Sequence, residues 1–213
     1  MAFGCGVLIS AVAYDLIMDG FEKGGLWPIL AGAVLGSAAY TLANVLLNRR
    51  GARHRKRSGD QQANARSEDG GGLAIAVGSL LDGIPESIVL GVGLLTGDGI
   101  SVAILAAIIL SNFPEGLSSA VGMKGAGHGR RYILGLWGGI AIVSGLASMS
   151  GAALFSGAPP ELLAVVNAVA AGALLTMITD TMIPEAVDGE GEGTGALVVL
   201  GLLTAFTITQ LGG

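Results

Sequence analysis

The stretch LAIAVGSLLDGIPESIVLGVGLL, residues 73–95, decides the class of fold. A helix of about 20 apolar residues is long enough to cross the ~30 Å hydrocarbon core of a bilayer. The apolar residues are continuous rather than alternating, which favours a helix over a strand. Asp82, Pro85 and Glu86 interrupt this run, and each is costly inside a membrane helix. The stretch therefore predicts a membrane helix in which two acids and a proline have a specific role.

The next apolar run repeats the pattern as SNFPEG at 111–116. Asp82 and Glu86 are four residues apart, and Asn112 and Glu115 are three apart, so each pair shares one helix face. Consecutive membrane helices run antiparallel, so the two motifs predict an inverted repeat with its Pro-Glu steps near the midplane. Transporters often place binding sites in this way.

The composition agrees with a membrane protein. The 213 residues are 52% hydrophobic and only 13% charged, against about 25% charged in ordinary soluble domains. A soluble α/β protein rich in Ala and Gly is the alternative, but the apolar runs are too long for it. We interpret the chain as an all-α membrane protein, a bundle of seven transmembrane helices forming a single domain. The expected spans are 2–20, 26–47, 73–95, 100–122, 132–155, 162–183 and 194–211.

The basic residues predict the orientation of the bundle. Every Lys and Arg except Lys23 falls in the loops 48–72 and 123–131, which lie on one side of seven alternating spans. The positive-inside rule makes that side cytoplasmic. We expect loop 48–72 to be flexible and to lie against anionic lipid headgroups of the bilayer, with no nucleic-acid partner.

The sequence has few cysteine and histidine residues that could form other kinds of functional site. Cys5 is the one cysteine, so the chain has no internal disulfide, and His54 and His128 both fall outside the spans. These residues exclude a three-histidine zinc site within one chain and a serine–histidine dyad at membrane depth. We therefore expect no enzyme and no prosthetic group.

A second set of acids lies near the span ends. Asp15, Asp19, Asp180 and Glu185 are interpreted as structural residues or as acids along an access path. The stretches AYDLIMDG (13–20) and ITDTMIPEA (178–186) also resemble each other weakly. Asp15 and Asp180 raise the alternative of an intramembrane aspartyl protease. The nearest partner motif for such an enzyme, LTGD at 95–98, lies in a turn, which disfavours it.

The mid-span acids carry the functional argument. No Lys or Arg lies within the expected spans, so Asp82, Glu86 and Glu115 must be protonated, hydrated or bound to a cation. Pro85 and Pro114 each free a backbone carbonyl one turn earlier. A single Pro-Glu step is usually a kink with a protonated acid, but two neighbouring copies favour an oxygen-ligand site for a divalent cation. The candidate ligands are Asp82, Glu86, Asn112 and Glu115.

These motifs resemble those of the ZIP (Zrt/Irt-like) family of divalent metal transporters. DGIPES and SNFPEG look like the paired His-Asn-x-Pro-Glu-Gly-like motifs of the family's fourth and fifth helices. The resemblance extends to FGCGVLISAVAYDLIMD (3–19), VSGLASMSGAALF (143–155) and MITDTMIPEA (177–186), which are similar to the second, sixth and seventh helices. It implies an eight-helix metal transporter that forms a homodimer. The chain would then begin at the second helix, so we expect either an upstream helix or a protein that has lost it.

The resemblance also implies roles for single residues. Glu86 and Glu115 match the two glutamates that hold the primary metal, and Asn112 matches a ligand of a secondary site. Asp82 stands at the position of the first-motif histidine, and Gly83 at that of the neighbouring asparagine. Replacing imidazole by carboxylate hardens the site, which shifts the expected preference from Zn²⁺ towards Mn²⁺ or Fe²⁺.

The second metal site of the family is degraded in this chain. Ser148-Met149 stands where the sixth helix often has Glu-Pro, so one main site is expected. The expected function is uptake of Zn²⁺, Mn²⁺ or Fe²⁺ into the cytoplasm across a prokaryotic plasma membrane. The alternative is a non-transporting membrane homologue with a structural or regulatory role. The acidic run between Glu185 and Glu192 is expected to be a solvated loop.

Overall fold

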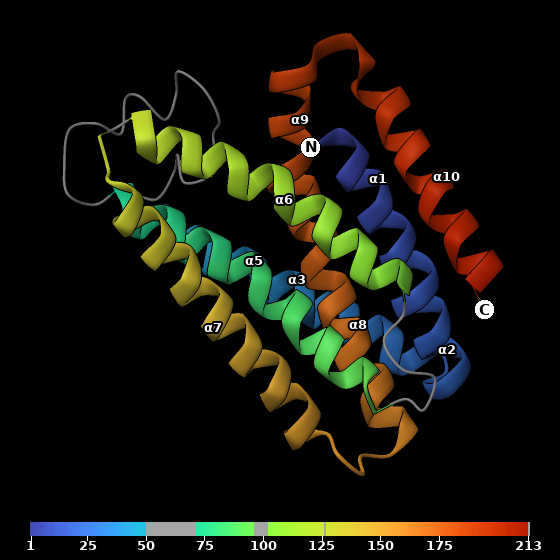
Figure 1. The fold of residues 1–213 in the computed structure, drawn as a ribbon. Helices are drawn as coiled ribbons and strands as arrows, with labels where there is room; N and C mark the ends of the chain where they lie inside the picture. Colours follow the sequence, from blue (N-terminus) through green and yellow to red (C-terminus); the bar gives the residue numbers. More distant parts are fainter. Residues whose placement is uncertain (50–70, 96–101, 126, 213) are drawn as a thin grey trace.

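The computed structural model describes residues 1–49, 71–95, 102–125 and 127–212, and within them every regular element is a helix (Figure 1). The all-α prediction is therefore confirmed for these residues. In chain order the elements are α1 (Ala2–Ala11), the π-helical η1 (Val12–Met18), α2 (Asp19–Gly24), α3 (Leu26–Arg49), α5 (Gly71–Gly93), α6 (Val102–Gly125), α7 (Arg130–Leu154), α8 (Pro160–Met177), the π-helical η3 (Ile178–Met182), α9 (Ile183–Glu190), the 3₁₀ turn η4 (Gly191–Gly193) and α10 (Thr194–Gly212).

In the described part of the chain, five helical segments are long and apolar enough to cross a bilayer, which indicates an integral membrane protein. They are Ala2–Gly24, Leu26–Leu46, Arg130–Leu154, Pro160–Gly189 and Gly191–Leu211. Helices α5 and α6, of 23 and 24 residues, coincide with the third and fourth expected spans. At 1.5 Å per residue each is about 35 Å long. Their crossing of the membrane, and with it the seven-span bundle and the inverted repeat, stays a prediction.

The outer faces of these helices are apolar. Large side chains such as Val34 on α3, Leu134 on α7 and Leu200 on α10 are more than half exposed. Water would penalise such surfaces at every turn of the helix, whereas lipid chains cover them without cost. The exposure pattern is therefore that of helices which face a bilayer.

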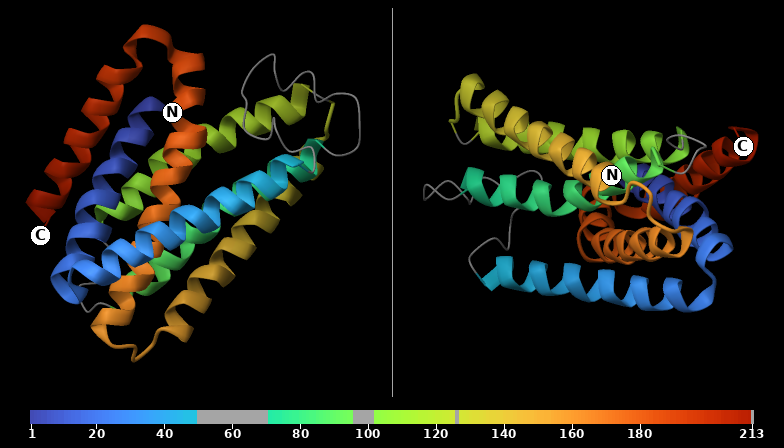
Figure 2. Two further views of the ribbon diagram at one scale, coloured as in Figure 1. Left: turned by 180° about the vertical axis from the view of Figure 1, so that it is seen from behind. Right: turned by 90° about the horizontal axis from the view of Figure 1, so that it is seen from below.

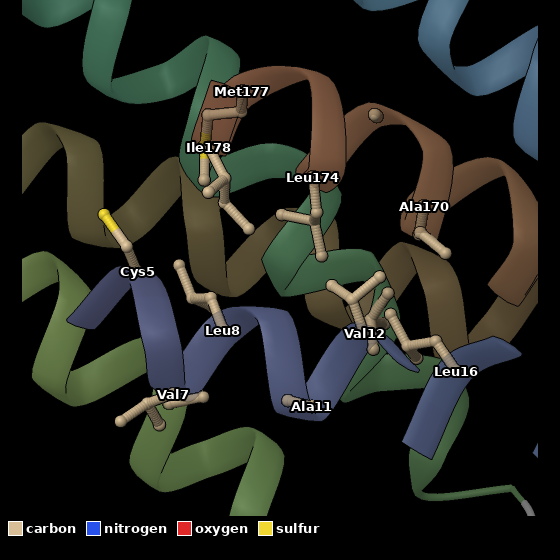
Figure 3. Close-up of a cluster of buried hydrophobic side chains, with 14 of the residues drawn as sticks. Cys5, Val7, Leu8, Ala11, Val12, Leu16, Ala170, Leu174, Met177 and Ile178 are labelled. Atoms are coloured by element: carbon tan, nitrogen blue, oxygen red, sulfur yellow. The ribbon is translucent and has the colours of Figure 1, made fainter. Parts of the chain in front are cut away.

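The buried core lies between the N-terminal segment and α8. Helix α1 is apolar on all its faces, which is typical of a central helix, and it contacts α6, α9 and α10. Figure 3 shows Leu8, Val12 and Leu16 from this segment, and Leu174 from α8, within one cluster of buried side chains. This cluster fixes the central helices on which the candidate site borders.

Glycines bring three pairs of helices into backbone contact. At each of these positions a Cβ atom would overlap a carbonyl oxygen of the neighbouring helix, so no larger residue fits without moving a helix. The contacts are Gly36 on Val169 between α3 and α8, Gly6 on Val198 between α1 and α10, and Gly91 on Ser148 between α5 and α7. Small residues at such positions let membrane helices pack closely.

Two helical segments extend beyond the expected spans. The first helical segment continues past residue 20 to Gly24, where Lys23 forms an ion pair with Asp19 at 2.7 Å. The sixth continues past residue 183 as α9, and Pro184 lies in the first turn of that helix. The expected solvated loop between Glu185 and Glu192 is therefore mostly helix.

The helix ends that flank the two basic loops lie together at one end of the bundle. Figure 2 shows the end of α3, the start of α5, the end of α6 and the start of α7 close to this end in both views. Lys124, Arg130 and Arg131 are exposed there. Most of the expected loop 48–72 lies outside the described residues, and the cytoplasmic location of this end stays a prediction.

Candidate metal centre

Helix α5 buries a carboxylic acid near its middle. Glu86 is only 2% exposed, and it follows Pro85 within an uninterrupted helix. Pro85 has no N–H to donate one turn back, so the carbonyl of Leu81 loses its usual helical partner. An ionised carboxylate at membrane depth costs about 2.5–3.5 kcal/mol on insertion scales, so it needs a specific partner.

Asn112 of α6 provides one such partner. Its amide nitrogen Nδ2 donates a hydrogen bond of 2.7 Å to Oε2 of Glu86, although the two residues are 26 positions apart. The bond is short, as expected when the acceptor is charged. The structure thus brings together two of the four predicted ligands, one from each Pro-Glu motif.

A small cavity borders Glu86 on the side of the central helices. Its volume is about 10 Å³, at the lower limit for holding a water molecule. Apart from Glu86, the lining side chains are all apolar: Leu8, Ala11, Val12, Leu16, Val89, Ile104, Ala107, Ile108 and Leu174. A buried water needs two to four polar partners, so this cavity is dry. The surroundings of Glu86 on the side of α1, η1 and α8 are therefore apolar.

Helix α7 approaches the same turn of α5. A Cβ atom on Gly83 would lie 3.5 Å from Oγ of Ser144, which is ordinary contact. Ser87 donates its hydroxyl to the carbonyl oxygen of Gly83 at 2.6 Å, which satisfies that hydroxyl within α5. Ser144 of α7 therefore lies beside Gly83, the residue that follows Asp82 on α5.

The backbones of the remaining predicted ligands are helical, but their side chains lie outside the described part. Asp82 lies one turn before Glu86 on α5, and Glu115 lies three residues after Asn112 on α6. Within the residues whose side chains are described, no group of three or more His, Cys, Asp or Glu is arranged to hold a metal ion. Glu86 and Asn112 are therefore in contact, and the four-ligand set stays a prediction.

Two of the four acids near the span ends lie in π-helical segments that the sequence did not predict. Asp15 lies in the π-helical segment η1 and Asp180 in the π-helical segment η3. Oδ2 of Asp15 is buried and has no hydrogen-bond partner among the described residues, whereas Asp180 is exposed. The weak similarity between 13–20 and 178–186 was the one signal that linked the two segments. Single turns of π-helix are frequent at functional sites.

One of the two histidines lies in the described part of the chain. His128 is exposed and stacks on Tyr132, with 4.6 Å between ring centroids, at the turn between α6 and α7. His54 lies outside the described residues. Neither fact changes the expectation that the candidate centre uses oxygen ligands.

Comparison with known proteins adds no assignment to this geometry. No protein-family model matches the chain, and no curated protein matches it significantly.

Proposed function

We propose that the protein transports a divalent transition-metal ion, of the Zn²⁺, Mn²⁺ or Fe²⁺ class, into the cytoplasm. The observation that supports this most directly is the hydrogen bond between Glu86 and Asn112, which joins the two Pro-Glu motifs at a buried position. A carboxylate and an amide oxygen are ligands that hard and borderline divalent cations accept. The resemblance to ZIP transporters supports the same assignment, and the metal is the substrate rather than a resident cofactor.

In this proposal Asp82, Glu86 and Glu115 supply carboxylate oxygens, and Asn112 supplies an amide oxygen. The metal exchanges its hydration shell for these ligands at mid-membrane, where the acids are otherwise costly. The cavity towards α1 and α8 is small and otherwise apolar, so it offers the metal no further ligand on that side of Glu86. The basic end of the bundle would face the cytoplasm.

The test is metal accumulation by elemental analysis in cells that express the wild type or Glu86→Gln. Glutamine preserves the shape of the side chain but removes its charge, so we expect metal accumulation to fall to the level of the empty vector. Glu22→Gln is the matched control, because Glu22 is exposed in α2 and far from the motif in sequence. Equal amounts of the three proteins in the membrane fraction must be verified.

Two results would overturn the proposal. One is a wild type that raises no metal above the vector despite good membrane expression. The other is a Glu86→Gln variant that accumulates metal like the wild type. The first result would favour the non-transporting homologue with a structural or regulatory role, particularly if adding upstream coding sequence did not restore uptake.

A further prediction concerns the choice of metal. Asp82 stands where the resembling family has histidine, and carboxylates favour harder ions than imidazole does. Asp82→His should therefore raise the ratio of Zn²⁺ to Mn²⁺ uptake. Competition between the two metals, measured in the same vesicles, checks this. An unchanged ratio would show that Asp82 does not contact the metal.

A further inference from the structure

The turn between α6 and α7 carries three exposed cations. Lys124 lies in the last turn of α6, and Arg130 and Arg131 begin α7. Within the described part of the chain none of the three side chains forms an ion pair or a hydrogen bond, whereas Lys23 is paired with Asp19. The sequence contains no Asp or Glu from residue 116 to residue 160. The positive charge of this turn is therefore available to an anionic partner.

Backbone hydrogen bonds hold this turn in one shape. The N–H of His128 donates to the carbonyl oxygen of Met123 at 3.0 Å, and the N–H of Gly127 donates to that of Lys124 at 3.1 Å. Gly127 has a φ of 92°, in the left-handed region that glycine adopts after the end of a helix. The ring of His128 also stacks on Tyr132. A turn that is already fixed loses little conformational freedom when a partner binds to it.

The surface changes from charged to apolar within one helical turn on both helices. Val121, three residues before Lys124 on α6, is 63% exposed, and Leu134, three residues after Arg131 on α7, is 71% exposed. Residues three apart share a helix face. The exposed ring of Tyr132 lies at this boundary, as tyrosines do at the level of lipid headgroups. A partner that covers the boundary must combine a negative charge with an apolar chain.

We propose that the α6–α7 turn binds an anionic phospholipid. Lys124, Arg130 and Arg131 surround the headgroup phosphate, and the acyl chains lie along the apolar faces of Val121 and Leu134. A guanidinium group suits this role, because it donates two parallel hydrogen bonds to phosphate oxygens. The site is separate from the basic loop 48–72, and it does not depend on the proposed transport function.

The chain contains a reporter close to this turn. Trp137 lies on α7 seven residues after Arg130, about 10 Å along the helix axis. Trp27→Phe leaves Trp137 as the one tryptophan of the chain. The fluorescence of Trp137 is therefore sensitive to lipids beside α7, and lipids bound by loop 48–72 elsewhere contribute little to it.

The experiment measures quenching of Trp137 by brominated lipids in the Trp27→Phe protein. Bromine on the acyl chains quenches tryptophan at short range. The protein is reconstituted into phosphatidylcholine bilayers that contain phosphatidylglycerol, with bromine on one lipid or on the other. The two quenching curves give the preference for the anionic lipid beside Trp137. We expect a preference of about fivefold or more, since each basic residue near an anionic headgroup adds severalfold to binding.

Two charge-removing variants in the same background locate the preference. Arg130→Gln/Arg131→Gln should reduce it to nearly equal binding of the two lipids, and both side chains are exposed, so the fold should be kept. Lys23→Gln is the control, because Lys23 ends α2 at the opposite end of the bundle (Figure 1). It should keep the full preference.

A second measurement needs no substitution at the turn. Raising the salt concentration from 0.1 M to 1 M shortens the Debye length from about 10 Å to about 3 Å, so the preference should fall. Three results would overturn the proposal. They are equal quenching by the two lipids in the Trp27→Phe protein, a preference that the double arginine variant keeps, and a preference that salt does not change.

Discussion

Two interhelical contacts in this molecule each contain a side-chain hydrogen bond, but they are built in different ways. Between α3 and α8, the hydroxyl groups of Thr176 and Ser37 form a hydrogen bond of 2.8 Å, beside the glycine contact of Gly36 on the α8 backbone. Between α5 and α6, Asn112 donates to the buried acid Glu86 at 2.7 Å. The closest neighbours of the α5 glycines Gly83 and Gly91 belong to α7, not to α6.

The difference distinguishes a contact that holds two helices together from a contact that holds a buried ionisable side chain. The α3–α8 contact joins two neutral hydroxyl groups on helices that already touch through their backbones, so the hydrogen bond adds little. The α5–α6 contact places an ionisable group where burial is costly. We therefore expect substitutions in the first contact to change stability, and substitutions in the second to change function.

The largest expected effect on folding comes from Gly36→Val. The new side chain would overlap the backbone of α8 at Val169, so the two helices must separate. Overpacking typically costs 1–3 kcal/mol, and a clash with backbone on a whole helix should cost at least about 3 kcal/mol. Thermal unfolding of the purified protein in detergent measures this. Gly139→Ala, a site with open space around it, is the control. An unchanged unfolding temperature for Gly36→Val would contradict the described α3–α8 contact.

A matched pair on α5 sharpens the comparison. Gly91→Ala should destabilise the α5–α7 contact strongly, because its Cβ would overlap the carbonyl oxygen of Ser148. Gly83→Ala should be nearly neutral or slightly stabilising, since its Cβ would lie 3.5 Å from Oγ of Ser144 and alanine favours helices by about 0.5–1 kcal/mol. Comparing the unfolding temperatures of the two variants tests the pair. Similar losses at both sites would mean that α7 does not pack on α5 as described.

The smallest effect is expected from Thr176→Val. The substitution removes the hydroxyl that bonds to Ser37 and leaves the shape of the side chain unchanged. The hydroxyl also bonds within its own helix to Gly172, so we expect a loss of about 1 kcal/mol or less. Metal uptake per folded molecule should be unchanged. A transport defect at normal protein levels would show that the α3–α8 contact also takes part in function.

The sequence predicted the helices well because their signal is local. Continuous apolar runs of membrane length identify helices without knowledge of neighbours. The two helices that extend beyond their expected spans share a feature: polar residues continue a helix where their side chains find partners or solvent. Lys23 pairs with Asp19 one turn earlier, and α9 continues through exposed Asp188. From composition alone, both stretches are predicted to be loops.

The candidate site was predictable in part. The spacing of the two Pro-Glu motifs placed Glu86 and Asn112 together, and the structure brings them into contact. Their relation as acceptor and donor, and the dry cavity beside Glu86, depend on how four helices meet and have no local sequence signal. The π-helical segments around Asp15 and Asp180 were likewise not predicted. The glycine contacts also depend on the partner helix, since exposed glycines such as Gly139 look the same in sequence.

The most direct test of the central claim is the amount of metal bound to the purified protein. Equilibrium dialysis against Mn²⁺ or Zn²⁺, followed by elemental analysis, should find about one ion per wild-type chain, since one main site is expected. Glu86→Gln should bind far less at the same concentration, with an unchanged unfolding temperature in the absence of metal. Equal binding by the two proteins would contradict a metal centre built on Glu86.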